Sequence, residues 1–290
     1  MSGAARVAAF AVVLALVFVG AAVAGGAVDP EGAGESEDHA DAGGHGGAEG
    51  RAAEGSSEAP PVRGLAVAED GLRLAVDQSE LRRGAQEQLS FQIVDESGEA
   101  VRDFDLEHER RMHLIVVRRD LTGFRHLHPT MSEDGTWRTP VRLADAGSYR
   151  VFADFSREGE RHTLASDLRI DGAAALQDLP APRSTFATDG GYEVELEDTR
   201  TAPGEAAELS FTVTRDGKPV EVEPYLGADG HLVALREGDL AFLHVHPTEG
   251  GEGDAIGFEA TFPTAGRYRL FLQFKHDGAV ETAEFTLEAD

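Results

Sequence analysis

The segment AGSYRVF at residues 146–152 recurs as AGRYRLF at residues 265–271, an offset of 119 positions. A second pair of segments is related in the same way, since LSFQI at residues 89–93 is matched by LSFTV at residues 209–213. The two offsets are nearly equal, so small insertions account for the difference. The sequence therefore predicts that one domain has been duplicated, and a chain of 290 residues has room for two domains of ordinary size.

Short apolar runs separated by turn residues fill both copies. Within residues 89–93 apolar and polar side chains alternate, as they do in a strand with one buried face. No stretch beyond the N-terminus shows helical periodicity. Many short strands with regular turns predict a β-sandwich. In the first copy we expect strands near residues 72–76, 87–94, 112–117, 124–128, 136–143, 149–155 and 162–170.

The pattern Asp-x-Gly-x-Tyr-x-Val at residues 145–151 resembles the tyrosine corner of immunoglobulin-like sandwiches, in which the tyrosine hydroxyl anchors the turn before strand F. A cysteine normally follows that tyrosine by two residues. Val151 and Leu270 hold these positions here, so we expect apolar packing to replace the disulfide. The second copy has Thr264 in place of the aspartate, and a cupredoxin-like sandwich would give nearly the same pattern. The predicted fold is all-β, with two tandem immunoglobulin-like or cupredoxin-like β-sandwiches.

The composition disfavours several classes of function. A formal net charge of −27 argues against nucleic acid and anionic membrane surfaces as partners. Cysteine is absent, which excludes disulfide bonds, thiolate metal sites and a blue-copper centre. No P-loop, nucleophile elbow or paired-carboxylate pattern occurs, and the cupin arrangement of His-x-His with a following Glu differs between the copies. We predict that the protein is not an enzyme.

The N-terminal sequence predicts export. Residues 7–28 carry no charge and follow Arg6, so they form either a cleaved secretory signal or a membrane anchor. The basic amino end and the acidic segment after it orient the rest of the chain outside the cytoplasm. The protein is therefore expected to be extracytoplasmic, either membrane-anchored or secreted.

Changes in composition mark the domain boundaries. The stretch before residue 64 is acidic and rich in Gly and Ala, and such a composition cannot bury enough apolar surface to fold. The run Leu-Pro-Ala-Pro at residues 179–182 is typical of a stiff linker. The expected segments are a signal peptide or membrane anchor at 1–28, a disordered linker at 29–63, a first β-sandwich at 64–172, a linker at 173–182 and a second β-sandwich at 183–290.

Six of the eleven histidines occupy shared positions in two related segments. The first is HLIVVRRDLTGFRHLHP at residues 113–129, and the second is HLVALREGDLAFLHVHP at residues 231–247. In a hairpin whose register pairs Val117 with Phe124, the opening histidine and the two closing histidines share one sheet face. The matching register is available in the second segment.

Three imidazoles at the end of a hairpin can supply three nitrogen ligands to a transition metal. We predict one such site in each copy, with copper preferred to zinc. The alternative is that the histidines are structural, with rings that hydrogen-bond to loops or pack on aromatic side chains, and a register slip of one residue would separate them. The predicted ligands are His113, His126 and His128 in the first copy and His231, His244 and His246 in the second.

The second histidine segment, together with YLGADG at residues 225–230, resembles a signature of exported bacterial proteins, many of them actinobacterial and largely uncharacterised. The segment at residues 113–129 is similar to the same group, and the resemblance covers about residues 65–288. In fold and setting these proteins are similar to CopC-like and YtkA-like periplasmic copper-handling sandwiches. The N-terminal copper-binding histidine of CopC-like domains has no match here, so that similarity implies no ligand.

These patterns predict an exported, non-enzymatic protein that binds a transition metal, copper before zinc, for buffering or delivery. The expected partners are the metal ion, another extracytoplasmic protein and, through the N-terminal segment, the membrane. The alternative function is a cell-surface interaction or scaffold module in which the histidines are structural.

Overall fold

Strands and turns make up all the secondary structure in the residues that the computed structural model describes, which are 62–197, 201–243, 245–248 and 255–290. No helix occurs within these ranges, so none there is long and apolar enough to cross a membrane. The all-β prediction is confirmed for this part of the chain. The expected signal or anchor and nearly all of the 29–63 linker lie outside the described residues.

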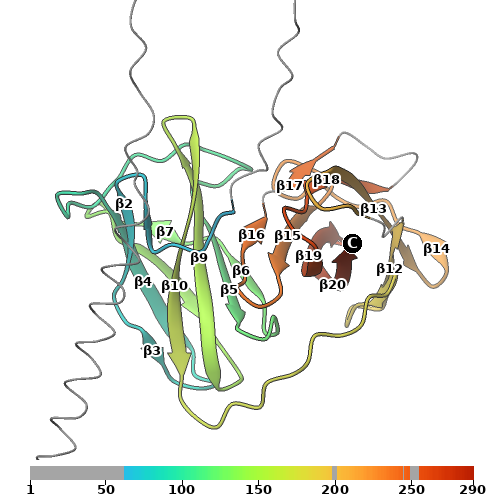
Figure 1. Ribbon diagram of the computed structural model, residues 1–290, viewed down its shortest axis with the longest axis horizontal. Coiled ribbons are helices and arrows are strands. Elements are labelled where there is room, and N and C mark those ends of the chain that lie inside the picture. The colour runs from blue at the N-terminus through green and yellow to red at the C-terminus, as the bar shows by residue number, and fades with distance from the viewer. Residues whose placement is uncertain (1–61, 198–200, 244, 249–254) are drawn as a thin grey trace, which may run out of the picture. The chain divides into compact units, whose positions relative to one another are not determined.

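The first repeat is a sandwich of two sheets. Its strands are β1 (Ala68–Glu69), β2 (Leu72–Val76), β3 (Glu80–Leu81), β4 (Glu87–Val94), β5 (His113–Arg118), β6 (Arg125–Leu127), β7 (Thr130–Met131), β8 (Trp137–Val141), β9 (Gly147–Arg157) and β10 (Glu160–Ile170). One sheet has the order β1-β2-β4-β8-β7 and the other the order β3-β10-β9-β5-β6 (Figure 1). Side chains from both sheets form a single apolar core.

The second repeat is built in the same way. Its strands are β11 (Thr185–Ala187), β12 (Tyr192–Glu197), β13 (Ala206–Arg215), β14 (Lys218–Pro219), β15 (His231–Arg236), β16 (Phe242–Leu243), β17 (Val245–Pro247), β18 (Ile256–Thr261), β19 (Gly266–His276) and β20 (Ala279–Ala289). One sheet has the order β11-β12-β13-β18-β17, with β14 paired to β13, and the other the order β16-β15-β19-β20. A second apolar core fills the space between these sheets.

The strand orders are those of an immunoglobulin-like sandwich. In the first repeat β2-β4-β8-β7 corresponds to the strand order A-B-E-D, and β10-β9-β5 corresponds to G-F-C. In the second repeat the corresponding strands are β12-β13-β18-β17 and β20-β19-β15. The prediction of two tandem β-sandwiches is therefore confirmed.

Alternation along the sequence decides which side chains enter the cores. Strands β2 and β4 have the bounds that the sequence predicts. In β4, Leu89, Phe91 and Ile93 are fully buried, and the polar residues between them are partly exposed. The two-residue strands β1, β3 and β7 were not predicted, because a strand that short carries no periodicity.

A tyrosine corner closes each repeat. The hydroxyl of Tyr149 donates to the carbonyl oxygen of Asp145 at 2.9 Å, and the hydroxyl of Tyr268 donates to that of Thr264 at 2.8 Å. The acceptor is a backbone carbonyl in both cases, which explains why threonine can replace aspartate in the second copy. The side chains at the cysteine positions are fully buried in the cores, as expected of apolar packing in place of a disulfide: Val151 and Leu270.

A third apolar cluster lies between the repeats, which belong to one compact unit, Ser57–Asp290. Phe124 stacks on Phe271 with ring centroids 4.0 Å apart, and the centroid of Phe152 lies 5.5 Å from that of Phe242. In the duplication Phe124 corresponds to Phe242, and Phe152 to Phe271. The repeats therefore meet through the same surface, as do the subunits of a two-fold symmetric dimer.

This contact buries β5 on both of its faces. Leu114 and Val116 point into the core of the first repeat, whereas Ile115 and Val117 belong to the cluster between the repeats. The histidine that opens the strand, His113, lies at the same face as Ile115 and is only 4% exposed.

Candidate metal centre

Strands β5 and β6 bring the first set of histidines together. Ile115 pairs with His126 in the β5–β6 ladder, which is the register that the sequence predicts. Since residues two apart in a strand point the same way, His113 lies on the same face as Ile115 and His126. His128 follows β6, before the chain crosses to the other sheet at β7.

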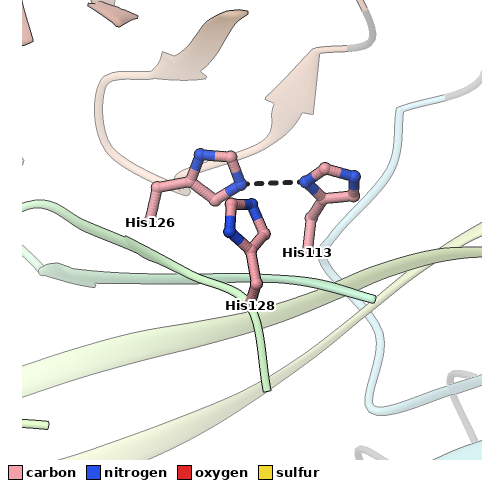
Figure 2. A group of neighbouring side chains, drawn as sticks. All are labelled: His113, His126 and His128. Carbon is pink, nitrogen blue, oxygen red and sulfur yellow. Dashed lines mark hydrogen bonds between the residues drawn. The ribbon is translucent and has the colours of Figure 1, made fainter. Parts of the chain in front are cut away.

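The rings of these three residues, here called the histidine cluster, point toward one another (Figure 2). One nitrogen from each of His113, His126 and His128 can be chosen so that all lie within 4.8 Å of one another. Nδ1 of His113 is 3.0 Å from Nε2 of His126. A tetrahedral zinc ion bound at about 2.0–2.1 Å holds its ligand nitrogens about 3.3 Å apart. The spacing therefore suits a single transition-metal ion.

The outward nitrogens of two rings lie against oxygen acceptors. Nδ1 of His126 is 2.7 Å from Oε1 of Gln273, on β19, and Nε2 of His113 is 3.4 Å from the carbonyl oxygen of Glu107. Both oxygens can only accept, so an outward nitrogen makes its bond only in the tautomer that places the ring proton on it. The inward nitrogens then turn two lone pairs toward each other at 3.0 Å, a contact that needs a cation or a shared proton between them.

The third ring is held differently. Nε2 of His128 is buried and has no hydrogen-bond partner in the part of the chain that the structure describes. A buried polar atom without a partner is costly in free energy, and a bound ion is one of the groups that can remove that cost. A metal ion bound to Nε2 of His128 would satisfy this nitrogen.

The surroundings keep the cluster uncharged. Burial, with a further contribution from His128, lowers the pKa of His113 to about 4. Burial and the nearby Arg110 lower the pKa of His128 to about 4 as well. The pKa of His126 lies well below its usual value, first because of burial and then because of the two neighbouring rings. Neutral imidazole is the form that binds metal, so no proton has to be removed at neutral pH.

Two further histidines pack beside the cluster. The ring of His231, which opens β15, is parallel to that of His113 within 7° at a centroid distance of 5.4 Å, and it lies 4.6 Å from the ring of His126. His108, on the loop before β5, lies 6.2 Å from His113 and 6.1 Å from His231. The predicted set for this site contained neither. No local pattern encodes the approach of His231, because it depends on how the repeats dock.

A buried carboxylate lies opposite His113. Asp154, on β9, pairs with His113 in the β5–β9 ladder and accepts a hydrogen bond from Thr163 at 2.6 Å. Burial raises the pKa of Asp154 to about 6. Asp154 and His113 border a small cavity of about 30 Å³, which is large enough to hold a water molecule. The sequence did not predict a role for this carboxylate, because no motif distinguishes Asp154 within strand β9.

The second predicted set is not assembled among the described residues. Leu235 pairs with Phe242 as the matching register requires, but β16 ends one residue later. The chain then joins the opposite sheet as β17, where His246 lies opposite Glu259. In the first repeat the corresponding crossing comes only after His128, which is why the two copies differ.

The prediction of a matching site in the second copy stays a prediction, because its residues are not all described. His231 packs on the rings of His113 and His126 in the cluster of the first repeat. His244 lies outside the described residues. Within the described ranges the only group of three close metal-ligating side chains is the histidine cluster.

The fold and the site define a tandem immunoglobulin-like β-sandwich protein with a histidine cluster where its repeats meet. The chain belongs to the family described as Domain of unknown function (DUF8832), whose model matches residues 66–172 and 186–290. The two matches confirm the duplication. No curated protein sequence matches the chain.

Solved structures of two adhesins and an alpha-2-macroglobulin show distant similarity. The Escherichia coli adhesin FdeC has 14% identity and a TM-score of 0.28, covering 78% of this chain and 66% of its own. A Salmonella alpha-2-macroglobulin has the same identity and TM-score, with coverage of 78% and 15%. The Yersinia pseudotuberculosis adhesin InvE has 11% identity and a TM-score of 0.25, with coverage of 75% and 58%. The chain spans less than two thirds of each, and at such TM-scores these likenesses carry no argument about function.

Proposed function

We propose that this chain is an exported, non-enzymatic protein that binds one transition-metal ion at His113, His126 and His128. The observation that carries the proposal is the 3.0 Å approach of the two inward nitrogens while both outward nitrogens lie against oxygen acceptors. An ion there would accept both lone pairs and a third from His128. Buffering or delivery of the metal outside the cytoplasm is the role that such a site suits.

We propose that the site binds copper in preference to zinc. Imidazole nitrogens bind both metals, and a given set of nitrogen ligands binds Cu(II) more tightly than Zn(II). The chain has no cysteine, so no thiolate ligand is available to favour a different metal ion. Copper(II) and zinc(II) are therefore the ions to compare.

The test is a metal titration of residues 57–290 against a competing chromophoric chelator. We expect one tight equivalent, which is lost when His113 and His128 are both replaced by Gln. The matched control is His276→Gln, because that ring bonds to the hydroxyl of Tyr192 at 2.7 Å and lies at the end of β19. The control should bind like the wild type. Binding that survives His113→Gln/His128→Gln would place the ion elsewhere and overturn the proposal.

A second candidate is a cell-surface interaction module in which the histidines are structural. The packing of His231 on His113 and His126 favours it, because three stacked rings help to join the repeats. In that case the wild type binds no ion more tightly than an unstructured histidine tract does. The same double substitution would then lower only the free energy of unfolding.

Export is a separate part of the proposal and rests on the uncharged residues 7–28 after Arg6. Protease added to intact cells should cleave the chain beyond residue 29. Full protection of the chain until the cells are lysed would contradict export. Fractionation of the membranes then distinguishes an anchor from a cleaved signal.

A further inference from the structure

The second repeat supplies a side chain to the histidine cluster, although all three candidate ligands belong to the first. Gln273 lies on β19 and pairs with His231 of β15 in the sheet ladder. Its Oε1 accepts from Nδ1 of His126 at 2.7 Å, and its amide nitrogen donates to Oγ1 of Thr282 at 3.3 Å. The bond to Thr282 uses the amide as donor, so the oxygen is the atom left for His126.

This bond decides which nitrogen of His126 is free. Because Oε1 of Gln273 only accepts, the proton of a neutral His126 ring must sit on Nδ1. Nε2 is then a lone pair, and it is Nε2 that faces His113. An outer hydrogen bond that fixes the tautomer and orientation of a ligating histidine typically raises metal affinity about 10- to 100-fold.

His231 adds a second contribution from the same repeat. Its ring covers those of His113 and His126 at centroid distances of 5.4 and 4.6 Å. The described side chains that offer ligand atoms within 4.8 Å of one another are His113, His126 and His128, so we assign His231 as a cover over the site rather than a ligand. Beyond it, the apolar contact of Phe124 with Phe271 continues the interface.

We propose that Gln273 is a positioning residue of the metal site, and that the second repeat thereby couples metal binding to the docking of the two repeats. This inference rests on the proposed function. It adds that the site is complete only when β19 lies against β6. An ion bound in the first repeat should consequently stabilise the second repeat as well.

The first test compares the zinc affinity of the chain and three variants by chelator competition. Gln273→Met keeps the size of the side chain but removes the acceptor, and we expect it to bind zinc about 10- to 100-fold more weakly. Gln273→Glu restores an acceptor and should recover affinity at least to the wild-type level. Gln92→Met makes the same chemical change on β4, in the other sheet of the first repeat, and should leave affinity unchanged.

The outcomes separate this inference from the proposed function. Loss of zinc in His113→Gln/His128→Gln but wild-type affinity in Gln273→Met would overturn the inference alone. A wild type that binds neither copper(II) nor zinc(II) would overturn both. Urea unfolding in the presence of a chelator identifies any variant that is simply misfolded, and recovery in Gln273→Glu excludes a purely structural effect.

The second test measures amide hydrogen exchange of the full chain with and without zinc. Coupling predicts that zinc slows exchange in peptides covering β15 and β19 as well as β5 and β6. In Gln273→Met the zinc effect on β15 and β19 should shrink. Protection confined to β5 and β6 of the wild type would show that the first repeat binds the ion by itself, and the coupling would be refuted.

Discussion

His113 and His126 illustrate how little separates a structural pair of histidines from a metal site. A proton shared between their inward nitrogens gives a chain of donors from His113 through His126 to Gln273. In that arrangement Nε2 of His113 turns a lone pair toward the carbonyl oxygen of Glu107. A metal ion replaces the shared proton, and Nε2 of His113 can then donate to that carbonyl. The ion thus satisfies every polar atom of the pair.

The lowered pKa values predict how the metal-free protein responds to acid. The pKa of His113 and that of His128 are about 4 in the folded chain, against an ordinary value of 6.5. The unfolded chain therefore binds more protons between pH 6.5 and pH 4, and the free energy of unfolding falls as pH falls through that window. Asp154 acts in the opposite direction, because its raised pKa favours the protonated folded state as pH falls.

Urea unfolding at pH 7.5 and pH 5, in the presence of a chelator, measures this effect. The comparison is with His113→Gln/His128→Gln, which retains Asp154 and so isolates the histidines. We expect the loss of stability between the two pH values to be larger in the wild type than in the variant. An equal loss in both proteins would mean that these rings are not buried in neutral form.

Among the strands and turns, the tyrosine corner is the feature that both repeats share most closely. We expect Tyr149→Phe and Tyr268→Phe each to lower the free energy of unfolding by about 1 kcal/mol, the usual net contribution of one hydrogen bond. Tyr149→Phe removes the bond to the backbone carbonyl at 2.9 Å. Tyr268→Phe removes the corresponding bond at 2.8 Å and also the weaker contacts of the hydroxyl with N and Oγ1 of Thr264, at 3.3 and 3.1 Å, so its cost should be at least as large. Equilibrium urea unfolding measures both. A clear cost in the first repeat with none in the second would show that Thr264 does not sustain the corner.

The hairpin of β5 and β6 shows what the sequence can predict at this scale. The alternation in Phe-x-His-x-His predicts a hairpin register that pairs Ile115 with His126, which the structure confirms. No sequence pattern marks the early end of β16, because the point at which a chain crosses from one sheet to the other depends on the strands packed around it. The crossing of the chain to the other sheet after β16 therefore could not be foreseen from the two related segments.

One signal of the contact between the repeats was present in the sequence. The run from Leu114 to Val117 is apolar at every position, whereas a strand with one solvent-facing side would alternate. Such a run indicates burial on both faces, and the structure shows both faces covered. What the run could not identify was the partner, since the second repeat covers this face only through long-range docking.

For the whole molecule, the docking of the repeats is tested by a double-mutant cycle on the Phe124–Phe271 stack. We expect Phe124→Ala and Phe271→Ala to couple by about 1 kcal/mol in the free energy of unfolding, as stacked aromatic pairs do. Phe124→Ala with Phe285→Ala is the matched control, because Phe285 lies in the core of the second repeat. Strict additivity for the stacked pair would contradict the contact between the repeats.

The most direct test of a metal site at the histidine cluster is anomalous diffraction from crystals of residues 57–290 grown with one equivalent of zinc. Data above and below the zinc absorption edge locate the ion without assumptions about its ligands. We expect a single strong peak about 2.0–2.1 Å from Nδ1 of His113, Nε2 of His126 and a ring nitrogen of His128. A peak at His246 with none at the cluster, or no peak in zinc-saturated crystals, would contradict the metal site.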